Sequence, residues 1–262
     1  IGDYAFINCS SLEAITVTEG NPTYHSAGNC LIETADKELV LGCKNSVIPT
    51  DGSVTSIGEY AFQGCSSLTN IILPECLTSI YSSAFSNCTS LEQVTIPTGV
   101  TSIGGAAFSG CTRLMSITIP ESVTSIGDYV LSNCTSLMSI TIPKSVTAIG
   151  ERAFYSCTGL ASVAISNGVT TIGDYAFSAC YSLTNVTIPE SVTSIGKASF
   201  AGCSKLPKVT IPKGVTSIKD HTFYECTGLT DVYDAGTESD WQRITIESKN
   251  DPLLNAAKHY TT

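Results

Sequence analysis

One short phrase recurs along this chain every 23 residues, and a cysteine ends each copy. The copy at residues 182–203 reads SLTNVTIPESVTSIGKASFAGC, and its neighbours repeat it with few changes. A fixed period of this length is typical of a solenoid, in which similar coils stack in one direction. The period therefore predicts one elongated repeat domain, and it is marked by Cys65, Cys88, Cys111, Cys134, Cys157, Cys180, Cys203 and Cys226.

Each repeat contains the signals for one coil. In the copy above, the apolar residues of 183–188 alternate with polar ones, which predicts a short strand that Pro189 ends. Residues 192–195 predict a second short extended segment. Gly196 would then begin a helical or 3₁₀ turn that finishes near Cys203.

The phenylalanines predict how the coils stack. All of them fall at one position of the repeat, so we expect a continuous column of rings in the core. A single coil cannot offset its own backbone entropy of about 1–2 kcal/mol per residue, so it must bury its faces against its neighbours. The predicted fold is a strand-dominated α/β solenoid with parallel strands on its inner face, short strands and helical or 3₁₀ turns on its other sides, and a column formed by Phe6, Phe62, Phe85, Phe108, Leu131, Phe154, Phe177, Phe200 and Phe223.

The period is interrupted near the N-terminus. The extra residues fall at 29–43, where a hairpin would pair Ile32 with Leu41 and Cys30 with Cys43, with its apolar face inward. We therefore predict a solenoid domain at 1–231 that carries a hairpin insert at about 20–50.

Both ends of the chain depart from the repeat in informative ways. After Val232 the phrase dissolves into a strand-like stretch at 243–246 and a short helix begun by Asp251 and Pro252, so 232–262 is predicted to be a C-terminal cap. At the other end, residues 1–6 match the middle of a repeat, so we expect the chain to be part of a longer protein.

Charge excludes some classes of partner. The chain has 23 acidic and 13 basic residues and a net charge of −10, so it has no basic stripe to neutralise phosphates. Nucleic acid is therefore a poor candidate partner, and acidic lipid surfaces are disfavoured for the same reason. No apolar run approaches the roughly 18–20 residues that span a bilayer, so no direct membrane insertion is predicted.

The cysteines are predicted to be free and buried. Equivalent cysteines on adjacent coils would have parallel Cα–Cβ bonds and lie about 4.8 Å apart. A disulfide prefers a distance of about 3.5–4.5 Å between its two Cβ atoms. Their spacing also lacks the short paired motifs of a zinc site. Cys30 and Cys43, opposed in the predicted hairpin, are the candidate disulfide, and Cys76 is predicted to be an exposed thiol.

The sequence shows no recognisable catalytic chemistry. It contains no nucleophile-elbow, zinc-protease or phosphate-binding motif. His25, His221 and His259 are scattered, and the acidic residues that follow the repeat glycine suit helix capping better than a carboxylate pair. We therefore predict no enzymatic activity, no catalytic residues, no cofactor and no metal.

The motif L-x-x-V-x-I-P followed by V-T-S-I-G-x-x-A-F-x-x-C closely resembles the repeats of the BspA-like leucine-rich repeat family, over residues 1 to about 231. The insert and the C-terminal tail also resemble segments that accompany such repeats in gut bacterial proteins. The resemblance implies a right-handed leucine-rich-repeat coil in a secreted or cell-surface bacterial protein. It also implies adhesion to a protein ligand, such as a host matrix protein or another cell-surface protein.

Leucine-rich repeats generally bind partners through exposed strand positions of the inner face. Strand propensity alone could explain the polar residues on that face. The methionine pair, Met115 and Met138, could equally be packed under a neighbouring turn. A structural stalk that displays another domain is the main alternative, and a carbohydrate-binding module would need more aromatic rings than Tyr233. The candidate binding residues are Gln93, Thr95, Met115, Thr118, Met138, Thr141, Asn185, Thr187, Lys208, Thr210, Asp231 and Tyr233.

Overall fold

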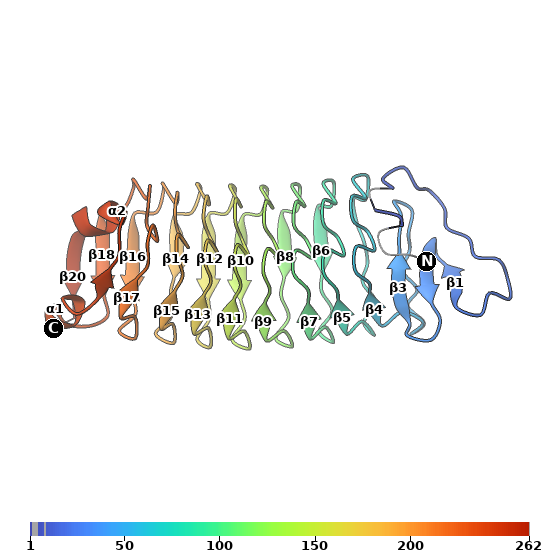
Figure 1. Ribbon diagram of the computed structural model, residues 1–262, viewed down its shortest axis with the longest axis horizontal. Coiled ribbons are helices and arrows are strands. Elements are labelled where there is room, and N and C mark those ends of the chain that lie inside the picture. The colour runs from blue at the N-terminus through green and yellow to red at the C-terminus, as the bar shows by residue number, and fades with distance from the viewer. Residues whose placement is uncertain (2–4, 8, 262) are drawn as a thin grey trace.

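The computed structural model describes residues 1, 5–7 and 9–261, and it shows an elongated stack of coils (Figure 1). Each coil of the repeat contributes short strands to two parallel columns. The first column contains β6 (Gln93–Thr95), β8 (Ser116–Thr118), β10 (Ser139–Ile142), β12 (Ser162–Ile165), β14 (Asn185–Thr187), β16 (Lys208–Ile211), β18 (Asp231–Asp234) and β20 (Ala257–Tyr260). The second contains β4 (Ser56–Ile57), β5 (Ser79–Ile80), β7 (Ser102–Ile103), β9 (Ser125–Ile126), β11 (Ala148–Ile149), β13 (Thr171–Ile172), β15 (Ser194–Ile195), β17 (Ser217–Ile218) and β19 (Thr245–Ile246).

The register of both columns follows the sequence period. Ser139 pairs with Ser162 in the first column, and Ile149 pairs with Ile172 in the second, each 23 residues apart. Along a first-column strand the aliphatic residues are buried and the polar residues between them are exposed, as the alternation predicts. The predicted strand-dominated solenoid is confirmed.

The predicted helical or 3₁₀ turn is wrong in its backbone. In each coil this segment is a run of tight turns that contains two residues with left-handed φ, such as Tyr175 (56°) and Ala179 (60°). The N–H of Ser178 donates back to Tyr175 at 3.1 Å, whereas the N–H of Phe177 donates to Ser199 of the next coil at 2.7 Å. Because every second N–H leaves the segment, the turns join neighbouring coils, which a helix with internal bonds cannot do.

The phenylalanine column is confirmed from Phe62 to Phe223. Successive rings stack with centroids 5.0–5.6 Å apart and planes within 12° of parallel. Leu131 occupies the column between Phe108 and Phe154 and is fully buried like them. Phe6 departs from the prediction, because its side chain is 39% exposed at the N-terminal end of the stack.

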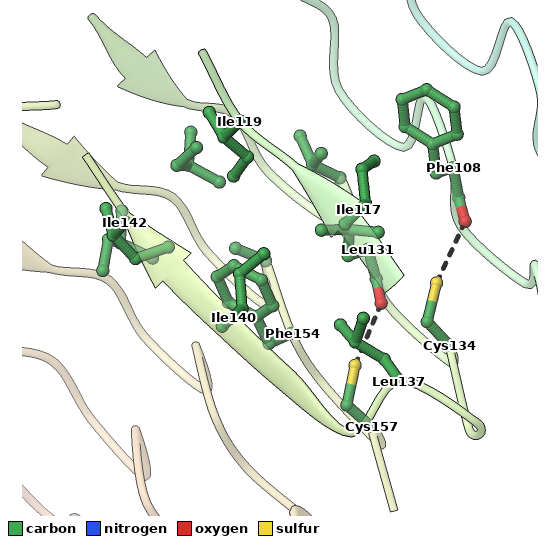
Figure 2. Close-up of a cluster of buried hydrophobic side chains, with 14 of the residues drawn as sticks. Phe108, Ile117, Ile119, Leu131, Cys134, Leu137, Ile140, Ile142, Phe154 and Cys157 are labelled. Carbon is green, nitrogen blue, oxygen red and sulfur yellow. Dashed lines mark hydrogen bonds between the residues drawn. The ribbon is translucent and has the colours of Figure 1, made fainter. Parts of the chain in front are cut away.

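The repeat cysteines do more than fill space. Cys65 donates to the carbonyl of Gly42. From Cys88 to Cys226, each thiol donates instead to the main-chain carbonyl of the column residue in the preceding coil, as Figure 2 shows for Cys134 to Phe108 and for Cys157 to Leu131. The same carbonyl also accepts the N–H of the cysteine in its own coil, as in Cys134 to Leu131 at 3.3 Å. Both acceptor sites of this buried carbonyl are thus used. Burial raises the pKa of the Cys157 thiol to about 12, so the ladder is protonated at neutral pH.

The insert forms an antiparallel sheet with β1 (Tyr24–Ala27), β2 (Cys30–Glu33) and β3 (Glu38–Leu41). Strand β3 pairs in parallel with β4, so the insert extends the second column. The predicted register is wrong: Ile32 lies opposite Leu39, because Lys37 takes a left-handed φ of 55° in the turn. A bulge between Leu31 and Ile32 then shifts the register, so that Leu31 lies opposite Leu41. Cys30 and Cys43 are free thiols that donate to the carbonyls of Gly28 and Asn29.

The predicted exposure of Cys76 is also corrected. Its thiol is half-buried and donates to the carbonyl of Val54 at 3.2 Å. In other coils a serine hydroxyl makes this bond, as Ser145 does to Val123 at 2.7 Å. Cys76 therefore replaces a hydrogen-bonding serine.

The C-terminal segment continues both columns. The helix predicted at Asp251 and Pro252 is α2 (Asp251–Asn255), and the strand predicted at 243–246 shortens to β19. The short helix α1 (Glu238–Trp241), with a capping box between Thr237 and Asp240, was not predicted. The proposed division at 231/232 falls inside β18 and stays a prediction.

Candidate binding face

We define the strand face as the exposed side chains of the first column, from the coil of the isolated bridge at Asn70 to β20, together with the residue just before each strand. The parallel register places most of the candidate binding residues in two lines, two residues apart along each strand. One line contains Gln93, Ser116, Ser139, Ser162, Asn185, Lys208 and Asp231, and the other contains Thr95, Thr118, Thr141, Ala164, Thr187, Thr210 and Tyr233. The face is therefore flat, regular and mostly composed of small polar groups.

The predicted methionine pair lies at the edge of this face, just before β8 and β10. Met115 is 39% exposed and Met138 is 60% exposed. Main-chain bonds run from Met115 to Glu92 of the preceding coil and from Ala161 of the next coil to Met138. The two side chains thus occupy the same position in adjacent coils and present apolar, adaptable surface beside polar neighbours.

Ile72 is an apolar member of the face that the sequence reasoning did not single out. It is 74% exposed and takes the place that Thr95 fills one coil later. The sequence did contain a signal for Ile72, because an isoleucine replaces the threonine of this line. Strand propensity alone, however, explains an isoleucine in a strand.

The C-terminal end of the strand face carries an aromatic pair. The ring of Tyr233 on β18 stacks on His259 of β20 with centroids 4.5 Å apart and planes at 16°. His259 Nε2 lies 2.6 Å from Asp231 Oδ1, and the Thr230 hydroxyl donates to Asp231 Oδ2 at 2.7 Å. The Thr230 bond and then the His259 contact lower the pKa of the Asp231 carboxyl. His259 was missed because it lies outside the repeat, so the period could not align it with Tyr233.

The hydrogen-bonded ladder of the strand face is interrupted between β8 and β10 and again between β14 and β16. The second interruption coincides with a proline. At the position just before the strand, Ala161, Thr184 and Thr230 each donate their N–H to the equivalent residue of the preceding coil. Pro207 holds this position before β16 and has no N–H to donate. A depression opens here between Asn185, Thr187, Lys208, Thr210 and Tyr233.

The described part of the chain contains no group of three or more His, Cys, Asp or Glu side chains that could hold a metal ion. Among the same residues, none of the helices has the length and apolar character needed to cross a membrane.

The paired columns of short parallel strands and the 23-residue coil define a β-solenoid of the leucine-rich repeat class. A family described as the BspA type leucine rich repeat region (6 copies) matches residues 40–161 and 124–243. The chain belongs to this family. None of the curated proteins matches it.

Solved structures agree with this assignment. A leucine-rich repeat protein from Eubacterium ventriosum has a TM-score of 0.67 and 24% identity over 77% of this chain, which spans 55% of that protein. The T. pallidum leucine rich repeat protein has a TM-score of 0.60 and 35% identity over 70% of this chain and 87% of its own. A leucine rich cell surface protein from Faecalibacterium prausnitzii is 25% identical over 88% of this chain and all of that one, but its TM-score of 0.41 is too low to support an argument.

Proposed function

We propose that this chain is a protein-interaction or adhesion module of a secreted or cell-surface bacterial protein, and that it binds a protein ligand through the strand face. The observation that supports this most is the exposure of Met115 and Met138 side by side on adjacent coils. Exposed apolar groups within an ordered polar surface are characteristic of contact sites. Methionine also adapts its shape to a partner at low cost.

The strand face has the physical properties of a recognition surface. Its backbone is held coil to coil by the parallel ladders, so little backbone freedom would be lost on binding. Several coils present enough area for the roughly 800 Å² that each partner buries in a standard protein interface. Catalysis is not part of the proposal.

A structural stalk is the alternative function. The regularity of the face supports it, since a spacer needs only stiffness. The exposed Ile72 and the methionine pair favour binding, because a stalk gains nothing from apolar side chains in water.

The test is binding of the purified chain to immobilised extracellular matrix proteins and mucins at physiological salt. We expect saturable binding to at least one protein. Absence of binding to every protein in the panel would favour the stalk.

A further inference from the structure

The depression beside Pro207 differs chemically from the rest of the strand face. Here the face is hollowed, with a volume of about 380 Å³, and the lining combines polar side chains with the Tyr233 ring. This volume is near the lower limit of the roughly 300–1,000 Å³ found for small-molecule sites.

One wall of the depression is an ordered aromatic ring. Tyr233 is 40% exposed on one side and stacked on His259 on the other. The contact between His259 and Asp231 fixes the imidazole, so the tyrosine ring is held in place before any ligand arrives. A half-exposed, fixed ring suits the packing of the C–H face of a sugar.

Although the whole chain is acidic, the depression contains a positive charge from Lys208. Asp231 is already engaged by Thr230 and His259. Lys208, which lines the depression, lies opposite Asp231 in the strand register, and its charge contributes to the lowered pKa of the Asp231 carboxyl. It makes no direct salt bridge with any residue that the structure describes. Because Thr230 and His259 already engage the Asp231 carboxylate, the Lys208 ammonium can pair with a carboxylate of a ligand. Charges elsewhere on the acidic chain are screened beyond about 8 Å at physiological salt.

We propose that this depression binds a carboxylate-bearing sugar residue. The Tyr233 ring packs against the pyranose, the Lys208 ammonium pairs with the carboxylate, and Asn185, Thr187 and Thr210 bond the hydroxyls. Hexuronic acids and sialic acids share this chemistry. The inference goes beyond the proposed protein binding, since it concerns another ligand class at the other end of the face.

The experiment is calorimetric titration of the whole chain in 150 mM NaCl with 3′-sialyllactose and digalacturonic acid, each against lactose as the neutral sugar. We expect at least one acidic sugar to bind roughly tenfold or more tightly than lactose, and the acid that binds identifies the source. Equal affinity for lactose, or no binding of either acid, would overturn the proposal.

Variants locate the site. Lys208→Gln should weaken acidic-sugar binding about tenfold or more, as expected for a lost charge-assisted bond, and Tyr233→Ala should abolish it. Lys144→Gln and Tyr181→Ala, at exposed positions outside the depression, are matched controls that should bind as the parent does. Unchanged affinity in Lys208→Gln would contradict the proposal.

Met115→Asp/Met138→Asp should leave sugar binding intact, so failure of the protein-binding proposal is seen separately.

Discussion

At the scale of single residues, the cysteine ladder shows what the sequence could and could not predict. The 23-residue spacing correctly predicted buried, unpaired thiols, because equivalent side chains on stacked coils point the same way. It could not predict the bond from each thiol to a main-chain carbonyl, such as Cys180 to Phe154 at 3.3 Å. That bond depends on how the turns orient their carbonyls, and the turns were predicted as helical.

The ladder predicts that the protein loses stability at alkaline pH under reducing conditions. Burial raises the pKa of Cys111, Cys157 and Cys226 to about 12, from 9.0 for an unburied thiol. Above pH 9 the unfolded chain loses these protons while the folded chain keeps them. Each thiol then lowers the free energy of unfolding by about 1.4 kcal/mol per pH unit up to about pH 12.

Urea midpoints measured from pH 7 to 10.5 test this expectation. Cys157→Ser should reduce the loss of unfolding free energy at alkaline pH by the contribution of one thiol. Cys76→Ser, at a half-buried site, is the control. A profile for Cys157→Ser identical to that of the parent would count against the argument.

At the scale of elements, the core column contains a compensated exchange. Most other coils from β4 onward pair alanine or serine with phenylalanine, as at Ala153 and Phe154, and the last repeat pairs Thr222 with Phe223. The coil that follows Phe108 has Val130 and Leu131 instead. All of these side chains are buried. The extra volume of valine therefore replaces volume that leucine lacks, which keeps the packing near native density.

This exchange predicts a coupling between the two positions. Leu131→Phe alone should overpack the core and destabilise the protein by about 1–3 kcal/mol, whereas Val130→Ala/Leu131→Phe should recover most of that loss and extend the ring stack. Thermal unfolding of Val130→Ala, of Leu131→Phe and of the double variant completes the double-mutant cycle. Simple additivity of the two single effects would refute the compensation.

The strands were the elements that the sequence predicted best, since alternation and period both point to them. The turns and the insert register were predicted poorly. Both depend on residues with left-handed φ that are not glycine, such as Tyr175 and Lys37, and such residues give no sequence signal. Helix α1 was missed because its four residues are too few to show a helical period.

At the scale of the whole molecule, a solenoid must close its open ends. The C-terminal end is closed by Asn250, which is 1% exposed. Its side-chain carbonyl accepts the N–H of Phe223 at 2.9 Å, and its amide donates to the carbonyl of Lys219 at 2.8 Å. One side chain thus supplies hydrogen bonds that the next coil would otherwise provide.

Asn250→Leu should therefore destabilise the C-terminal coils by about 1–3 kcal/mol, because it leaves the buried N–H of Phe223 without its partner. Asn255→Leu, at an exposed site in the same segment, is the matched control. Hydrogen exchange should accelerate at Phe223 in the first variant alone. Equal protection in both variants would mean that Asn250 does not close the stack.

The strand face is the feature of the whole molecule on which the functional account depends. The two double variants Met115→Asp/Met138→Asp, on the strand face, and Ser102→Asp/Ser125→Asp, on exposed positions of β7 and β9, add the same charge to the two columns. The most direct measurement is the affinity of both variants and the parent for the matrix protein that the parent binds, with thermal midpoints to confirm folding. We predict at least a tenfold loss for the methionine variant and an unchanged affinity for the serine variant. Equal affinities in all three chains would show that the strand face is not the binding surface.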